Sequence, residues 1–206
     1  MLCLVNWENA HLLGDALPAL HRLRHRVFVK RQGWNVPEYR GMEYDQFDTP
    51  AADYLVWFDN NRIPRGVTRL IPTTRPYMIK ELWSAHLSTL PPSIDTIWEA
   101  SRIGVDRDLP PDMRRRVLGE LICGCLELGL KSGFKEYLCV MHPKIIQRLL
   151  ISAGLNVDMD EPWDIDGEQV VIGKIEISRK ALLSAKEKYG INKLVVEKLG
   201  SELEAA

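Results

Sequence analysis

The first regular pattern of apolar positions predicts a helix from Leu17 to Arg31. Within it, Leu17, Leu20, Arg24 and Phe28 recur at steps of three and four residues, so these side chains share one face. Arg24 therefore occupies a position on a stripe that is otherwise apolar. The segment that follows, "QGWNVPEYRGMEYDQFDTPA", is punctuated by glycine and proline. It predicts a long loop, and such loops are often functional or disordered.

Strand-like runs of apolar and β-branched residues come next. Three strands are predicted, at Asp53–Asp59, Gly66–Thr73 and Thr96–Val105. The short segment "NNRIP" between the first two favours a hairpin. The order of these runs indicates a meander of neighbouring strands.

The second half of the chain alternates between helical and strand patterns. A helix is predicted from about Asp112, just after two prolines, to Ser132, with Gly133 ending it. The further predicted elements are a strand at Tyr137–Met141, a helix at Pro143–Ala153 ended by Gly154, a strand at Glu168–Ser178, a helix at Arg179–Tyr189 and a tail that forms a mixed-charge helix or frays. A meander followed by alternating helix and strand predicts an α/β (α+β) sandwich, with a mixed, mostly antiparallel central sheet flanked by helices.

Composition agrees with one packed core. The chain has 206 residues, of which 46% are hydrophobic and 27% charged, and no linker or repeat divides it, so we expect a single domain over residues 1–206. The net charge of −1 is unlike that of general nucleic-acid-binding domains, which are usually basic. No apolar run is long enough for a membrane span and the N-terminus lacks a signal-peptide pattern, which predicts no membrane insertion and a cytoplasmic location.

The four cysteines are spaced unlike a metal site. Cys3, Cys123, Cys125 and Cys139 contain no CxxC pair, so a zinc site or a disulfide framework is not predicted. We expect buried, reduced thiols.

The segment "EYDQFD" concentrates negative charge without a neighbouring cation. It places Glu43, Asp45 and Asp48 within six residues. These acids could be ordinary surface charges, since charged residues are seldom fully buried. A metal site is a further alternative, although loops that bind hard cations usually carry more oxygen ligands at a regular spacing.

Three arginines lie in patterns that ought to be apolar. Arg24 is on the apolar stripe of the first helix, Arg69 alternates with Val67 and Ile71, and Arg102 lies within "WEASRIGV". A buried guanidinium group is costly unless it is paired. The three arginines and the three acids of "EYDQFD" are therefore predicted to form one network across a cleft at the end of the sheet.

Four segments carry a family resemblance. In order and spacing, "LRHRVFVKRQGW", "EYDQFD", "GVTRLIPTT" and "IWEASRIGVD" resemble the acyl-homoserine-lactone synthases, or autoinducer synthases, over about residues 20–155. The resemblance implies an N-acetyltransferase-like fold, in which strands four and five splay apart around a pantetheine thioester. It also implies two substrates, S-adenosyl-L-methionine and an acyl thioester on acyl carrier protein or, in some members, coenzyme A. The products would be a quorum-sensing acyl-homoserine lactone, methylthioadenosine and the free carrier thiol.

The resemblance places S-adenosylmethionine among seven of these residues. They are Arg24, Phe28, Trp34, Glu43, Asp45, Asp48 and Arg69. The acids would offset the ammonium and sulfonium, Arg24 or Arg69 would hold the carboxylate, and the two aromatic residues would wall the adenosyl or sulfonium group. S-adenosylmethionine is a substrate here, and neither a cofactor nor a metal is expected.

The catalytic residues expected are Glu99, Ser101 and Arg102. Glu99 would act as the general base for the attacking amine, although a structural ion pair with an arginine is the alternative. On a regular strand Glu99 and Ser101 share a face and Arg102 points to the other. A local bulge, common near active sites, is therefore predicted to bring the three together.

The acyl donor has its own candidate residues. Val140 and Met141 would line the acyl pocket, and the lack of threonine near them disfavours a 3-oxo product. A dock for an acidic carrier protein, or for a coenzyme A phosphate, is expected at the basic residues Arg114, Arg115, Arg116, Lys144 and Arg148. The segment "RDLPPDMRRR" lacks the glycine-rich loop of acetyl-coenzyme A users, which favours carrier protein.

Two other functions are compatible with the pattern. The first is an N-acetyltransferase that uses acetyl-coenzyme A, which would not need the acid cluster. The second is a non-catalytic sensor that binds S-adenosylmethionine and regulates a partner.

Overall fold

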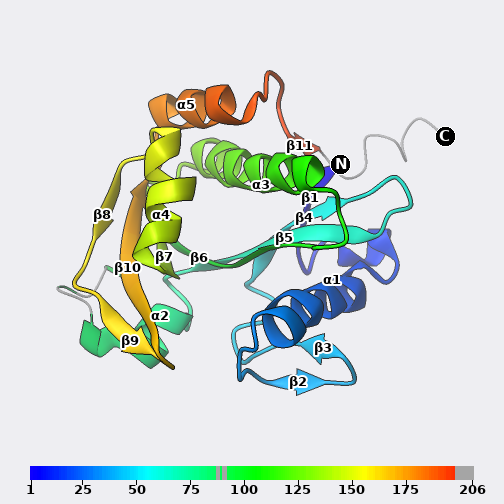
Figure 1. The fold of residues 1–206 in the computed structure, drawn as a ribbon, viewed down its shortest axis with the longest axis horizontal. Coiled ribbons are helices and arrows are strands. Elements are labelled where there is room, and N and C mark those ends of the chain that lie inside the picture. The colour runs from blue at the N-terminus through cyan, green and yellow to red at the C-terminus, as the bar shows by residue number, and fades with distance from the viewer. Residues whose placement is uncertain (87–88, 90–91, 198–206) are drawn as a thin grey trace.

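The computed structural model describes residues 1–86, 89 and 92–197. Its centre is a nine-stranded sheet in the order β11-β1-β4-β5-β6-β7-β10-β8, with β9 paired to β10 (Figure 1). The strands are β1 Leu2–Val5, β4 Asp53–Phe58, β5 Pro64–Pro72, β6 Ile97–Val105, β7 Glu136–Met141, β8 Val157–Met159, β9 Trp163–Ile165, β10 Glu168–Glu176 and β11 Val196–Glu197. The β1–β11 and β6–β7 pairs are parallel, and the other described pairs are antiparallel. This confirms the predicted fold class.

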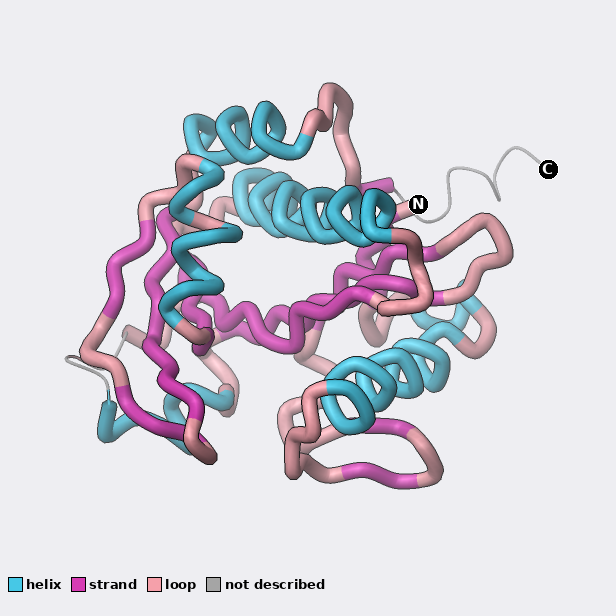
Figure 2. Tube along the Cα trace, in the orientation of Figure 1, coloured by secondary structure: helices cyan, strands magenta, loops and turns pink. Residues whose placement is uncertain are grey.

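Helices cover the two faces of the sheet separately (Figures 1 and 2). One face carries α3 Pro111–Ser132, α4 Pro143–Leu149 with the 3₁₀ turn Ile151–Ala153, and α5 Arg179–Tyr189. The other carries α1 Ala16–Arg24 with its π-helical extension His25–Arg31, the hairpin β2 Glu38–Tyr39 and β3 Met42–Glu43, and α2 Met78–Trp83; 3₁₀ turns lie at Ala10–Leu13 and Ser84–His86. No helix among the described residues has the length and apolar character needed to cross a membrane.

Several local predictions are confirmed and others are corrected. The first predicted helix exists, but its second half is a π-helix, a rare form that is frequent at functional sites. The predicted loop is not structureless, because Arg40 and Gly41 have φ of 50° and 73° and turn β2 into β3. Gly133, with φ of 76°, ends α3 as predicted. The end of the predicted tail element, residues 198–206, lies outside the described residues.

The sheet opens between β6 and β7. These strands pair only where Ile97–Glu99 lies beside Glu136–Leu138. Beyond that point β6 continues along β5 to Val105, and β7 continues along β10 to Met141. The two strands therefore diverge on the carboxyl side of Glu99, which confirms the predicted splay and leaves a gap in the middle of the sheet.

Candidate active site

Three arginines and three carboxylates form a closed ring beneath α1. Arg24 donates to Glu43 at 2.6 Å and to Asp48 at 2.5 and 3.0 Å. Arg69 donates to Asp48 at 2.9 Å and to Asp45 at 2.6 Å. Arg102 closes the ring by donating to Asp45 at 2.9 Å and to Glu43 at 3.1 Å. Each carboxylate is thus shared by two arginines, and the six residues, called the ion ring below, carry no net charge.

The ion ring confirms the predicted network and corrects the reading of these acids as surface charges. The side chains of Arg24, Arg69 and Glu43 are fully buried. Among the described residues, no group of histidines, cysteines and acids is placed to hold a metal ion. A buried ion that lost its partner would be strongly unfavourable, so the ring is stable only as a complete set.

The ring also fixes the charge states of its members. Burial alone would raise the pKa of Asp48, but the charges of Arg69 and Arg24 hold that pKa well below its ordinary value. Every nitrogen of the Arg24 guanidinium already donates to a carboxylate of the ring. An incoming substrate carboxylate would have to compete with these partners.

A bulge in β6 places Arg102 in the ring. Between the pairs Val67–Gly104 and Arg69–Ser101, β5 advances by two residues and β6 by three. Arg102 takes up the extra residue with a φ of 55°, a left-handed conformation that is strained for a residue with a side chain. As predicted, Ser101 and Arg102 now face the same side: Ser101 Oγ accepts from Arg69 Nε at 3.2 Å.

Two aromatic rings mark the most open side of the ion ring. Phe28 and Trp34 stack with their centroids 4.8 Å apart. The Arg102 guanidinium lies 5.9 Å from the centroid of Phe28 and 5.6 Å from that of Trp34. Trp34 is 42% exposed, whereas Phe28 is buried. The stack therefore joins the ion ring to a surface that a ligand can reach.

Glu99 lies beside the ion ring as an unpaired buried acid. Its side chain is 1% exposed, and Oε2 accepts from the backbone N–H of Ile79 at 2.8 Å. Oε1 has no hydrogen-bond partner among the described residues. Burial raises the pKa of Glu99, and the hydrogen bond from Ile79 and the charges of Arg69 and Arg102 only partly oppose this. Glu99 forms no ion pair among the described residues, so the structure does not show the alternative of a structural ion pair with an arginine.

Three residues of this site were not predicted. The Tyr54 hydroxyl donates to Asp48 at 2.7 Å, a ring nitrogen of His21 lies 2.9 Å from the Glu43 carbonyl oxygen, and the sulfur of Met78 contacts Arg69 at 3.1 Å. Tyr54 lies opposite Arg69 in the β4–β5 pair. The signal for Tyr54 is therefore the register of the predicted hairpin, which places it opposite a buried arginine. For Met78 and α2, no pattern in the sequence indicates a place in the site.

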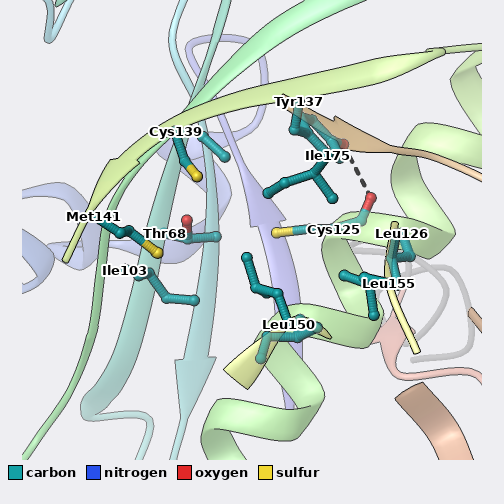
Figure 3. A pocket seen from close by; sticks show the side chains of 12 residues that line it. Thr68, Ile103, Cys125, Leu126, Tyr137, Cys139, Met141, Leu150, Leu155 and Ile175 are labelled. Atoms are coloured by element: carbon teal, nitrogen blue, oxygen red, sulfur yellow. Dashed lines mark hydrogen bonds between the residues drawn. The ribbon is translucent and has the colours of Figure 1, made fainter. Parts of the chain in front are cut away.

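An apolar cavity lies beside the gap between β6 and β7, on the face of the sheet opposite to the ion ring (Figure 3). Its volume is about 40 Å³, and its walls come from β5, β6, α3, β7, the end of α4 and β10. Thr68, Cys125, Cys139 and the Tyr137 hydroxyl, which donates to the Cys125 carbonyl at 2.9 Å, are the polar groups of the wall. Its mostly apolar lining favours an apolar group over a charged one.

The two residues predicted for an acyl pocket lie on opposite faces of β7. Met141 lines the cavity together with Tyr137 and Cys139. Val140 packs instead in the core beneath α1 and α2. Successive side chains of a strand alternate between faces, so only one of two neighbours can reach the cavity.

The predicted basic residues are not equivalent. Arg114 is committed to the carbonyls of Arg107 and Leu109 at 2.9 and 3.1 Å, and Arg116 pairs with Glu120 at 2.8 Å. Arg115, Lys144 and Arg148 are exposed. Lys188 of α5 lies close to these cations. Burial lowers the pKa of Lys188, and the charges of Arg115 and Arg148 lower it further. A basic surface therefore spans α3, α4 and α5.

Comparison with known proteins shows which family the chain belongs to. The sequence pattern of the autoinducer synthase family matches residues 10–183. An acyl-homoserine-lactone synthase of Pseudomonas aeruginosa is 30% identical over 168 residues, which are 80% of this chain and 81% of that protein. A solved coenzyme A-dependent acyl-homoserine lactone synthase, BjaI, with S-adenosylmethionine and isopentyl-coenzyme A, is 28% identical, with a TM-score of 0.85 over 96% of this chain and 92% of that one. A putative N-acetyltransferase from Lactobacillus plantarum, 18% identical with a TM-score of 0.54 over 86% of this chain and 99% of that one, shares the fold. The chain therefore belongs to the autoinducer synthase family and is an acyltransferase of the acyl-homoserine-lactone synthase kind.

Proposed function

We propose that Glu99 is the general base of amide formation between S-adenosylmethionine and an acyl thioester. The amine of S-adenosylmethionine attacks the thioester carbon, Glu99 accepts a proton directly or through one water, and the carrier thiolate leaves. The observation that supports this most is a buried carboxylate with a free oxygen and a raised pKa where β6 and β7 part. A base with a raised pKa takes up a proton more readily near neutral pH.

The second step is lactonisation within the same site. The methionine carboxylate attacks its own γ-carbon, the carbon–sulfur bond breaks, and methylthioadenosine leaves as a neutral thioether. Because the two reacting groups belong to one molecule, holding them in the right geometry supplies most of the acceleration. Backbone N–H groups of β6 and β7 beyond Glu99 and Leu138 lie past the last β6–β7 pair, and we assign the oxyanion of the first step to them.

S-adenosylmethionine binds on the open side of the ion ring in this proposal. Trp34 and Phe28 stack against its adenosyl or sulfonium group, and Arg102 holds its carboxylate. Arg24 and Arg69 act through Glu43, Asp45 and Asp48, whose charges they balance while they fix the shape of the pocket. All three guanidinium groups are engaged, but the side chain of Arg102 is 7% exposed whereas those of Arg24 and Arg69 are fully buried, which supports this division of roles.

The acyl donor enters with its chain in the apolar cavity. Met141 lines that cavity from β7, and Ser101 lies near Glu99 on β6, on the charged face of the sheet. Carrier protein and coenzyme A share the pantetheine arm, and the basic surface of Arg115, Lys144, Arg148 and Lys188 is complementary to an acidic carrier. Pro110 and Pro111 at the start of α3 offer no N–H to a phosphate, which also favours carrier protein, whereas the similarity to BjaI favours coenzyme A.

The setting of the reaction follows from the same features. S-adenosylmethionine is a substrate, and neither step requires a cofactor. The reduced thiols of Cys123, Cys125 and Cys139 fit a reducing compartment, so we place the enzyme in the cytoplasm. Residues of the site come from α1, the β2–β3 hairpin, β5 and β6 of one continuous sheet, so residues 1–206 act as one domain in this proposal.

Incubation with S-adenosylmethionine and a panel of acyl donors tests the proposal. Release of methylthioadenosine together with an acyl-homoserine lactone supports it, with acyl carrier protein and acyl-coenzyme A run side by side over several chain lengths. Acyl transfer without methylthioadenosine would indicate an acetyltransferase instead. Binding without turnover would indicate a sensor.

A further inference from the structure

A cluster of aromatic rings lies outside the ion ring, the apolar cavity and the basic surface. The indole of Trp163, on β9, stacks with the ring of His86, with their centroids 4.5 Å apart and their planes 5° from parallel. The ring of Trp83, the last residue of α2, also contacts Trp163, with the centroids 6.4 Å apart. Trp83 and Trp163 are half-buried, whereas His86 is exposed. We call these three residues the aromatic clasp.

The aromatic clasp connects the two halves of the opened sheet. α2 begins against the β6 half, where the backbone N–H of Ile79 donates to Glu99 at 2.8 Å. The other end of α2 meets Trp163, and α2 lies beside β9 in Figure 1. Trp163 pairs with Val170 of β10, next to the residue that pairs with Met141 at the end of β7. Since β6 and β7 part beyond Glu99, α2 reaches from the proposed base to the open end of the gap.

The start of α2 carries contacts on which the proposed reaction depends. The sulfur of Met78 contacts Arg69 at 3.1 Å and Arg102 at 3.3 Å, so α2 touches two arginines of the ion ring. Burial raises the pKa of Glu99, and the hydrogen bond from the Ile79 N–H is the first of the contacts that oppose this. A displacement of α2 would therefore change the base and the ion ring together.

α2 is too short to hold its own position. It has six residues, and a helix of this length needs packing to be stable in water. Its first two residues, Met78 and Ile79, are buried, but the next three are exposed. No side-chain hydrogen bond caps its first turn. Its second anchor is therefore Trp83, through the aromatic clasp.

We propose that Trp163 is a positioning residue for Glu99. Its ring, in contact with Trp83 and His86, anchors α2 across the gap and keeps the Ile79 N–H on the Glu99 carboxylate. This inference rests on the proposed function, because it takes Glu99 as the base. The role is indirect, since Trp163 acts through α2, and a small displacement of a catalytic group is enough to slow a reaction by about 100-fold.

Substitutions in the aromatic clasp test this role. Trp163→Ala removes the ring, Trp163→Phe keeps a ring that can stack, and His86→Ala removes one exposed partner. The matched control is Phe134→Ala, which breaks the stack of Phe134 on Trp98, with centroids 4.6 Å apart, in the core of the other face. Each variant is assayed for unfolding in urea, for KM of both substrates and for kcat as a function of pH.

Trp163→Ala should lower kcat by about 10- to 100-fold and leave the KM values unchanged, because the base is displaced while both substrate sites remain. The midpoint of the acidic limb of the pH–rate profile should move to higher pH, since a carboxylate that loses the Ile79 N–H holds its proton more tightly. Trp163→Phe should retain most of kcat, and His86→Ala should show the same changes at smaller size. Phe134→Ala should lose stability and keep the wild-type midpoint.

Wild-type kcat and midpoint in a destabilised Trp163→Ala protein would overturn the role of Trp163. A Trp163→Phe variant as slow as Trp163→Ala, or an equal shift of the midpoint in Phe134→Ala, would overturn it too. If Trp163→Ala does not fold, His86→Ala decides, and an unchanged midpoint there contradicts the proposal. Glu99→Gln in the same series separates the two inferences. A midpoint that persists in Glu99→Gln counts against the proposed base, whereas one that vanishes there but is unmoved by the clasp variants counts against the clasp alone.

Discussion

The two faces of β5 and β6 differ sharply although neighbouring residues build them. Arg69 enters the ion ring while Thr68, the residue before it, lines the apolar cavity. On β6, Glu99 and Ser101 face the charged side and Ala100 faces the cavity. Strand alternation accounts for this division.

The bulge breaks this alternation at one point. Ser101 and Arg102 both face the ion ring, and Ile103 then returns to the cavity. Without the extra residue, Arg102 would point into an apolar wall. One inserted residue thus gives the charged face its third arginine and leaves the other face apolar.

The charged face tolerates change far less than the apolar one. A ring of mutually paired ions depends on every member, because each loss leaves a buried charge uncompensated. An apolar cavity can be resized at a moderate cost, because its contacts have no required partner. We therefore expect the charged face to fix the amino-acid substrate and the cavity to set the acyl chain.

Loss of Arg69 should have the largest effect. Arg69→Ala leaves Asp45 and Asp48 buried with one partner each removed, so the free energy of unfolding should fall by about 3–5 kcal/mol. Thr68→Val, one residue away on the cavity side, should cost about 1 kcal/mol, the value of its hydrogen bond to the Ser101 carbonyl. Urea unfolding of both variants measures the difference. Similar losses for the two would show that the ion ring is not the fragile face.

Removal of the Glu99 charge should separate activity from stability. Glu99→Gln should lower kcat by about 10²–10⁴-fold, because the amine loses its proton acceptor. The free energy of unfolding should stay level or rise, since the amide avoids the cost of a buried carboxylate. The matched control is Glu120→Gln, a buried acid on the other face that accepts from Trp57 at 2.7 Å. A stable Glu99→Gln protein with wild-type turnover would exclude Glu99 as the base.

The pH dependence of stability should have opposite signs for two acids of the charged face. The pKa of Asp48 is lowered from 3.8, so its contribution is present above that pH and is lost as pH falls below it. The pKa of Glu99 is raised from 4.5, so the folded state binds its proton more tightly and stability falls as pH rises above 4.5. Each unit of pKa change is worth about 1.4 kcal/mol.

Unfolding of wild type, Asp48→Asn and Glu99→Gln between pH 3 and pH 8 measures both trends. The stability advantage of wild type over Asp48→Asn should grow with pH, and that over Glu99→Gln should shrink. In the wild-type pH–rate profile, the rate should rise with pH through a midpoint above 4.5, because Glu99 must lose its proton to act as the base. This rise should disappear in Glu99→Gln. Parallel trends for the two variants would contradict the assigned environments.

The sequence predicts the charged face well because buried charge is conspicuous. Arg24 on an apolar stripe and Arg69 between Val67 and Ile71 stand out, and the cost of a buried guanidinium then demands acids nearby. The bulge at Arg102 follows from the same cost, because it turns the Arg102 guanidinium towards the acids that pair with it. How the six charges alternate around the ring depends on the meeting of segments far apart in the chain, and no local pattern encodes it.

The apolar face was harder to predict because its residues look alike. Val140 and Met141 are equally apolar, and only the register of β7 decides which one reaches the cavity. Thr68 enters the same cavity from β5, so this polar wall residue lies on another strand than the predicted pair Val140 and Met141.

The smallest expected effect tests the cavity itself, with two neighbours on β7 as a matched pair. Met141→Ala enlarges the cavity, so the preference among acyl-chain lengths should move towards longer chains by roughly tenfold in kcat/KM ratio, as one or two methylenes in an apolar pocket allow. Val140→Ala removes a side chain from the opposite face and should leave that preference unchanged. Competition between thioesters of two lengths on the same carrier measures the ratio without any effect of donor docking. If Val140→Ala shifts the chain preference and Met141→Ala does not, the acyl chain lies on the charged side of the sheet and the division of labour between the faces is reversed.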